Sequence, residues 1–116
     1  MKNNVVKEKS FAFAIRIVNL YKFLVNEKKE FVLSKQLLRS GTAIGALVRE
    51  AEQGESKADF IHKLAIALKE TNETEYWLEL LHQTEHLESK AFESIHQDNV
   101  ELLKLLTSII KTSKGN

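Results

Sequence analysis

Apolar side chains recur every three or four residues along almost the whole chain, which is the spacing of one face of an α-helix. Proline is absent, and glycine occurs only at positions 41, 45, 54 and 115, so few residues interrupt this periodicity. We therefore predict an all-α fold. Its four helices are expected over residues 5–26, 30–53, 56–87 and 94–112.

Short polar segments separate the expected helices. The charged segment NEKKE at 26–30 allows the chain to reverse, and Gly54 is expected to end the second helix in the left-handed conformation. The third and fourth helices are expected to begin at Ser56 and Ser94, each in a capping-box pattern. Four helices with short connections indicate an antiparallel up-down-up-down bundle in a single domain of residues 1–116.

The first and third expected helices carry two apolar faces, although a monomeric bundle needs only one. A helix that is apolar on two sides is usually buried on two sides, so we predict a homo-oligomer. A monomer whose second face is ordinary surface is the alternative. In the first helix one face consists of Phe11, Ile15, Val18 and Val25 and the other of Phe13, Ile17, Leu20 and Leu24. In the third helix the second face consists of Ile66, Tyr76, Trp77 and Leu80.

Two glycines four residues apart, Gly41 and Gly45, interrupt the second helix at the edge of its apolar stripe. Each lowers helix propensity by about 1 kcal/mol relative to alanine, so a structural gain must offset that cost. Close packing of another helix backbone is the first explanation, and close approach of a ligand is the second.

The charge is balanced in total but uneven along the chain. Lys and Arg number 17 against 16 Asp and Glu, yet residues 1–53 carry a net 10 − 5 = +5 and residues 54–116 a net 7 − 11 = −4. Cations in the first half could contact the phosphates of RNA or DNA without sequence specificity, or they could form a solvated charged face. The candidate nucleic-acid-binding residues are Lys22, Lys28, Lys29, Lys35 and Arg49.

The sequence lacks the motifs of the common enzyme classes. There is no cysteine, no phosphate-binding glycine loop and no H-E-x-x-H pair. Glu79-x-x-His82 and Glu93-x-x-His96 have the spacing of di-iron bundle ligands, but the first helix offers no inward Glu after Glu8. We therefore expect no enzymatic activity, no metal and no cofactor.

Glu75 falls on the apolar stripe of the third helix, where an isolated charge would be unfavourable. We predict a structural network in which Arg39 pairs with Glu75 or Glu73, within or between subunits. A catalytic acid and simple solvent exposure are the alternatives for Glu75. The N-terminal sequence lacks a secretory signal and no uncharged run approaches 20 residues, so we expect a cytoplasmic protein that does not enter a membrane.

Three segments in this order resemble a known family: SFAFAIRIVNLYKFL, QLLRSGTAIGALVREA and SKADFIHKLAIALKETNETEYWLELL. The chain is similar to the bacterial four-helix-bundle proteins encoded in intervening sequences of 23S ribosomal RNA genes. It is also similar to the accessory proteins of diversity-generating retroelements, basic pentameric barrels thought to bind nucleic acid and a reverse transcriptase. The resemblance implies an antiparallel bundle that assembles as a ring, typically a pentamer, with no assigned enzymatic activity.

Positions that match the family are expected to hold helices and subunits together. They are Gln36, Arg39, Ser40, Glu50, Phe60, Glu73 and Glu75, to which the helix-packing arguments add Gly41, Gly45 and Trp77. Two functions follow. The first is a homo-oligomeric accessory protein that binds RNA or DNA, and the second is a structural or protein-interaction scaffold with no nucleic-acid affinity.

Overall fold

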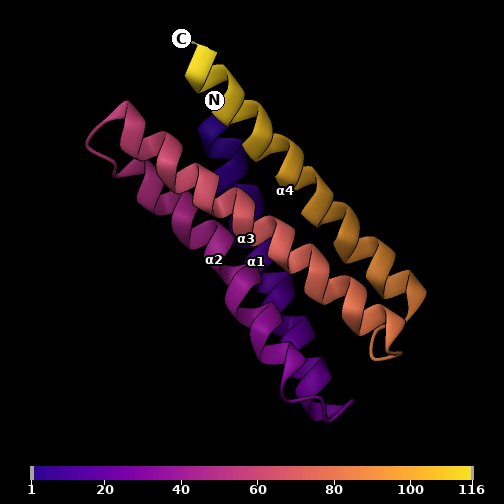
Figure 1. Ribbon diagram of the computed structural model, residues 1–116. Coiled ribbons are helices and arrows are strands. Elements are labelled where there is room, and N and C mark those ends of the chain that lie inside the picture. The colour runs from indigo at the N-terminus through magenta and orange to yellow at the C-terminus, as the bar shows by residue number, and fades with distance from the viewer. Residues whose placement is uncertain (1, 116) are drawn as a thin grey trace.

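The computed structural model describes residues 2–115, with side chains from residue 5 onward. Within this range the chain forms four helices and no strand, so the all-α prediction is confirmed. Figure 1 shows the helices in chain order. Their bounds are α1, Lys2–Asn26; α2, Leu33–Glu52; α3, Lys57–Gln83; and α4, Ser89–Gly115.

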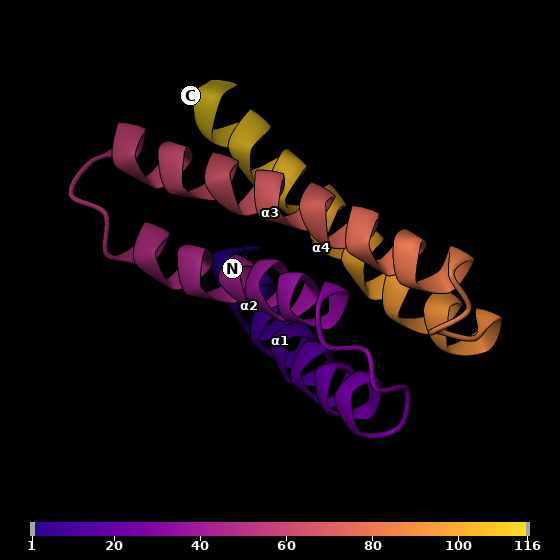
Figure 2. The same cartoon turned by 60° about the horizontal axis from the view of Figure 1, so that its bottom comes forward.

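Each helix packs against the next one along the chain, and the ribbon turns back after every connection (Figures 1 and 2). The α1 and α4 helices also contact each other, but more sparsely than the consecutive pairs. The result is an elongated body of 46 × 21 × 19 Å, whose length reflects helices of 20 to 27 residues. No helix within residues 2–115 is long and apolar enough to cross a membrane.

The second helix begins at Leu33, three residues later than predicted. The Glu30 carboxylate accepts hydrogen bonds from the backbone N–H groups at the start of α2, so Glu30 precedes the helix and does not belong to it. At the other end, α2 stops at Glu52, and Gly54 has no positive φ angle. The prediction of a left-handed Gly54 is therefore wrong. A Cβ atom at this position would lie 3.0 Å from the Ala51 carbonyl oxygen as well as 2.9 Å from Asp59 Oδ2, so close packing against the backbone explains the glycine better.

Ser56 caps the third helix as predicted, since its side-chain oxygen accepts a hydrogen bond from the Asp59 N–H at 3.0 Å. The third helix ends at Gln83, however, and the predicted extension to 87 is wrong. The prediction that α4 begins at Ser94 is also wrong, because the helix starts at Ser89. Ser94 and Gln97 lie inside α4, so their capping-box spacing is coincidental.

A left-handed residue ends α3. Glu85 has φ 67°, and the N–H groups of Glu85 and His86 donate to the carbonyls of His82 and Leu81 at 3.1 and 2.9 Å. This is a Schellman motif, which normally places glycine at the left-handed position. Because glutamate occupies that position here, the sequence carried no recognisable stop signal.

The core is an apolar seam that runs through all four helices. On α1 the buried face is the one that contains Phe13, Ile17 and Leu24, whereas Phe11 and Ile15 on the other apolar face remain about half exposed. Val18 and Val25 of that other face are partly buried. Only one of the two apolar faces of α1 therefore contributes fully buried side chains to the core of the folded chain.

Candidate nucleic-acid interface

A tight turn joins α1 to α2 and carries two of the five candidate cations, Lys28 and Lys29. The N–H groups of Glu27 and Lys28 both donate to the Phe23 carbonyl, at 2.8 and 3.4 Å. Lys29 then adopts the left-handed conformation, with φ 55°, and reverses the chain. The Glu30 N–H returns to the Leu24 carbonyl at 3.0 Å, which closes the turn.

The Glu30 side chain anchors this turn to α2. Its carboxylate accepts hydrogen bonds from Leu33 at 2.9 Å and Ser34 at 2.6 Å, and the Ser34 hydroxyl donates to the Glu30 carbonyl at 2.8 Å. Partial burial alone would raise the pKa of Glu30, but the backbone donors of Leu33, Ser34 and Val32 outweigh it and lower the pKa. The carboxylate is thus committed to the helix N-terminus.

The surface at this end of the molecule combines lysines with exposed apolar side chains. We call residues 22–35 the α1–α2 tip. Val32 is 71% exposed, Phe31 52% and Phe23 42%. The Lys28 ammonium lies 5.9 Å from the centre of the Phe23 ring, in a cation–π arrangement.

Four of the five candidate nucleic-acid-binding residues lie in this tip, and all four are exposed. They are Lys22, Lys28, Lys29 and Lys35. Arg49, the fifth, lies in the last turn of α2 at the other end of that helix, where its guanidinium stacks 4.9 Å from the Phe11 ring. The structure therefore groups the lysines but separates Arg49 from them.

The lysines of the tip form no ion pairs within the part of the chain whose side chains are described. Among the residues with described side chains, none of the five candidates has a carboxylate within 4.0 Å. Five other cations pair with carboxylates of neighbouring helices, whereas the remaining described lysines of α3 and α4 do not. These pairs are Lys7 with Glu52, Lys9 with Glu101, Arg16 with Asp98, Arg39 with Glu70 and Glu73, and Lys63 with Glu50.

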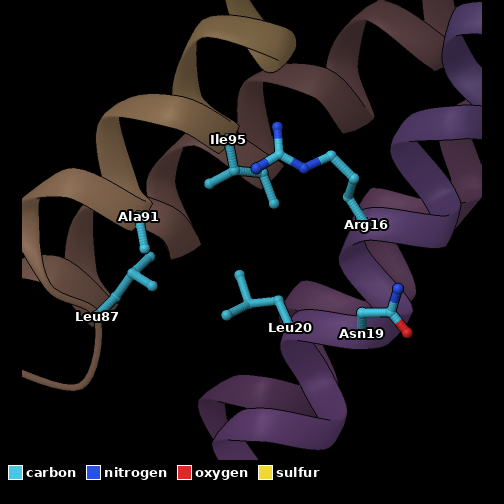
Figure 3. Close-up of a pocket in the computed structure, with 6 residues that line it drawn as sticks. All are labelled: Arg16, Asn19, Leu20, Leu87, Ala91 and Ile95. Carbon is cyan, nitrogen blue, oxygen red and sulfur yellow. The ribbon is translucent and has the colours of Figure 1, made fainter.

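A groove runs between α1 and α4, where these two helices pack sparsely. A hollow of 290 Å³ lies there, lined by residues of both helices. Figure 3 shows Arg16 and Leu20 of α1 extending toward Ala91 and Ile95 of α4. A second hollow of 420 Å³ shares some of these residues and extends to the tip. Its lining residues are Leu20, Phe23, Lys28, Leu87, Glu88 and Ala91.

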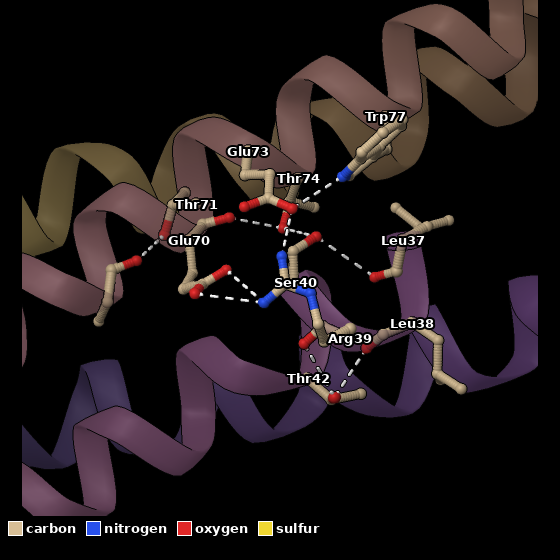
Figure 4. Close-up of polar contacts among 11 residues, drawn as sticks. Leu37, Leu38, Arg39, Ser40, Thr42, Glu70, Thr71, Glu73, Thr74 and Trp77 are labelled. Carbon is tan, nitrogen blue, oxygen red and sulfur yellow. Dashed lines mark hydrogen bonds and ion pairs between the residues drawn. The ribbon is translucent and has the colours of Figure 1, made fainter. Parts of the chain in front are cut away.

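Arg39 ties α2 to α3 through two carboxylates (Figure 4). Its Nη1 lies 3.2 Å from Glu70 Oε1, and its Nη2 donates to Glu73 Oε2. The Trp77 indole N–H donates to the same Glu73 oxygen at 3.0 Å. Hydrogen bonds from Trp77 and then from Arg39 hold the pKa of Glu73 below its usual range.

Of the two predicted partners of Arg39, Glu73 is confirmed, whereas Glu75 does not take part in this network within the chain. Glu75 lies on the side of α3 that faces α4, where its carboxylate is 3.5 Å from His96 Nε2. It is about one-third exposed and therefore needs no buried counter-charge. Glu70, which the sequence analysis did not select, is the second partner of Arg39. Its position one turn before Glu73 was the available signal.

The histidines of the two Glu-x-x-His motifs have other neighbours. His82 Nε2 lies 3.1 Å from the Ser89 hydroxyl, and the His82 ring stacks on Phe92 with centroids 4.4 Å apart. The His96 ring stacks on the same Phe92 at 5.0 Å. Across the described side chains, no three His, Asp or Glu residues come together as a metal-ligand group.

The chain matches the 23S rRNA-intervening sequence protein family over residues 2–108. It belongs to this family. The resemblance to the intervening-sequence proteins, drawn from the three sequence segments, is thus confirmed. A search of curated proteins found no match for this member of the 23S rRNA-intervening sequence protein family.

A solved structure agrees with this assignment. A crystal structure of a Bacteroides thetaiotaomicron protein, described as a protein of unknown function from the S23 ribosomal protein family, superposes with a TM-score of 0.95. The two sequences are 70% identical, and the match covers 96% of this chain and 99% of the other. The four-helix fold of this 23S rRNA-intervening sequence protein is therefore shared with an experimentally determined relative.

The remaining family-matched positions occupy different environments in this 23S rRNA-intervening sequence protein. Ser40 is fully buried, and its hydroxyl lies 3.0 Å from Thr74 Oγ1 (Figure 4). Phe60 packs at the edge of the core, as does Trp77. Gln36 and Glu50 are both exposed. Glu50 forms an ion pair with Lys63 at 3.2 Å.

A third hollow lies on the opposite side of α1 from the groove to α4. It measures 320 Å³ and adjoins the exposed strip of Phe11 and Ile15. Its floor contains small side chains, which let α1 and α2 approach closely. The lining residues are Phe11, Ala14, Thr42, Gly45, Ala46 and Arg49.

Proposed function

We propose that this protein is a non-enzymatic, cytoplasmic homo-oligomer that binds RNA or DNA in an accessory role. The antiparallel bundle would assemble as a ring of about five subunits, as the family resemblance implies. Binding would be independent of base sequence, because it would rest on contacts between lysines and phosphates.

One observation carries the proposal. The α1–α2 tip gathers within 14 residues four exposed lysines that form no ion pair with a described side chain. The lysines of α3 and α4 that also lack an ion pair are spread along a half of the chain in which carboxylates outnumber cations, 11 to 7. Glu30 belongs to the tip but is committed to the α2 N-terminus. The tip therefore offers positive charge that folding has not neutralised, although the whole chain carries only +1.

An exposed apolar strip supports the assembly. Phe11 is 51% exposed and Ile15 is 49% exposed on one side of α1, next to the hollow lined by Gly45 and Ala46. A strip of this kind beside small residues is suited to packing against a second copy of the chain. Symmetric repetition would then bring several tips onto one assembly and multiply a modest local charge.

Salt-dependent binding tests the nucleic-acid part. The affinity of the wild type for a fluorescent oligonucleotide should fall steeply with salt, and the combined variant Lys28→Glu, Lys29→Glu and Lys35→Glu should bind far more weakly. The matched control carries the same charge change on α4, at Lys90, Lys104 and Lys111. Equal affinities of the wild type and the tip variant would show that the tip is not the surface that binds nucleic acid.

A scaffold without nucleic-acid affinity is the second candidate. The observation in its favour is the nearly neutral total charge combined with the exposed apolar strip of Phe11 and Ile15. Native mass spectrometry of the protein purified from cells separates the two functions. A pentamer that retains nucleic acid supports the first, whereas a pentamer without it, and without salt-sensitive oligonucleotide binding, supports the scaffold.

A further inference from the structure

We propose that the α1–α2 tip recognises single-stranded rather than duplex nucleic acid, with the Phe31 ring as the surface on which a base stacks. Lys28 and Lys29 would contact the adjoining phosphates. This inference rests on the proposed function and names the form of nucleic acid that the tip would take.

Phe31 is exposed although the turn around it is well defined. About half of its side chain reaches solvent, and Val32 beside it is more exposed still. The preceding residues are fixed by the left-handed Lys29 and by the Glu30 carboxylate, which binds the N–H groups of α2. The ring is thus attached to a backbone that is already ordered before binding, which lowers the conformational entropy lost on binding.

Phe31 differs from Phe23, the other aromatic side chain of the tip. The Lys28 ammonium already lies 5.9 Å from the Phe23 ring centre, and Phe23 lines the hollow between the tip and α4. No ring or cation contact is made by Phe31 within the described residues. Its ring can therefore accept a base without displacing a partner.

The charge around Phe31 suits a phosphate chain. Residues 22–35 contain four lysines and two glutamates, a net 4 − 2 = +2. The N–H groups at the start of α2 are not a competing phosphate site, because the Glu30 carboxylate already accepts from them. Phosphates are therefore left to the lysine side chains.

The combination of one aromatic ring and neighbouring lysines selects for unpaired bases. In a duplex each base is stacked within the helix and its faces are covered, so Phe31 would have nothing to stack on. In a single strand the face of any base is accessible, and stacking on an aromatic ring strengthens binding regardless of sequence. Lysines alone would attract both forms.

Fluorescence anisotropy with a single-stranded oligothymidylate of roughly ten nucleotides, and with a duplex of equal length, tests the inference. Phe31→Ala should weaken single-strand binding about tenfold and leave duplex binding unchanged. Phe31→Trp should restore the single-strand affinity. Val32→Ala is the matched control, since Val32 is the still more exposed apolar neighbour of Phe31 but has no ring, and it should change neither affinity.

The outcomes separate this inference from the proposed function. If the wild type binds neither form, both fail. If it binds both forms and Phe31→Ala changes neither affinity, the proposed function stands and the stacking site is overturned. If Phe31→Ala reduces the oligomer mass in native mass spectrometry, Phe31 is a contact between copies or with an apolar protein partner, and the inference is also overturned.

Discussion

Gly41 of α2 lies directly against the side chain of Ile17 of α1. A Cβ atom built at Gly41 would be 2.7 Å from Ile17 Cγ1 and 2.9 Å from both Cγ2 and Cδ1. Ile17 is completely buried, so its side chain cannot move aside into solvent. The glycine therefore allows the two helices to approach each other, and this contact explains why a residue with poor helix propensity occupies the middle of α2.

Gly41→Ala should lower the free energy of unfolding. The added methyl group overpacks the core, at about 1–3 kcal/mol, while the gain in helix propensity returns about 1 kcal/mol. We expect a net loss of about 1 kcal/mol in urea unfolding at fixed subunit concentration. In an Ile17→Ala background, which removes all three crowding atoms, the same substitution should be neutral or stabilising. An equal loss in both backgrounds would show that the crowding is not the cause.

Arg39→Ala should destabilise the fold slightly, because Arg39 links α2 to α3 through Glu70 and Glu73. Half of the Arg39 side chain is exposed, so we expect a loss of about 0.5–1 kcal/mol that shrinks at high salt. A double-mutant cycle with Glu73→Gln measures the coupling. Oligonucleotide affinity of the intact oligomer should stay unchanged, and its loss with the assembly intact would contradict this structural role.

Glu30→Gln should have a pH-dependent effect on stability. Backbone hydrogen bonds hold the folded pKa of Glu30 below its unfolded value of about 4.3. The ionised carboxylate thus stabilises the fold above that pH, and this stabilisation disappears as the pH falls through the folded pKa. We expect the variant to lose about 1 kcal/mol of unfolding free energy at pH 7. The difference from the wild type should disappear as the pH falls through the folded pKa.

Glu27→Gln provides the comparison for that experiment, since Glu27 is exposed in the same turn and caps no helix. Urea unfolding of both variants across the pH range is the measurement. If the unfolding free energy of Glu30→Gln stays below that of the wild type at low pH, side-chain geometry and not charge stabilises the start of α2.

Ile15→Glu should dissociate the proposed oligomer. Ile15 is about half exposed on the strip beside Phe11, and a charge buried there without a partner would strongly disfavour association. Sedimentation or native mass spectrometry should show a smaller species, while the helical circular dichroism is retained. Ser108→Glu places the same charge on the exposed side of α4 and should leave the mass unchanged. An intact oligomer of Ile15→Glu would exclude this strip as the contact between copies.

The sequence predicted some details of the tip and the α2–α3 network but not others. The lysines could be selected because they lie in the first half of the chain, where cations outnumber carboxylates. Glu30 was assigned to the second helix, because its side-chain bonds to residues 32–34 depend on a turn that the sequence does not display. Arg39 was linked correctly to α3, but the choice between Glu73 and Glu75 depends on the rotation of α3 about its axis.

The sequence by itself determined the fold class, the number of helices and the family, because helical periodicity and the absence of proline are local properties of the chain. Only the tertiary structure decided which apolar face of α1 enters the core, since both faces are comparably apolar in sequence. It also decided which cations remain unpaired. Ion pairs between helices form across distances in space, and residues as far apart as Lys9 and Glu101 meet only when the bundle has closed.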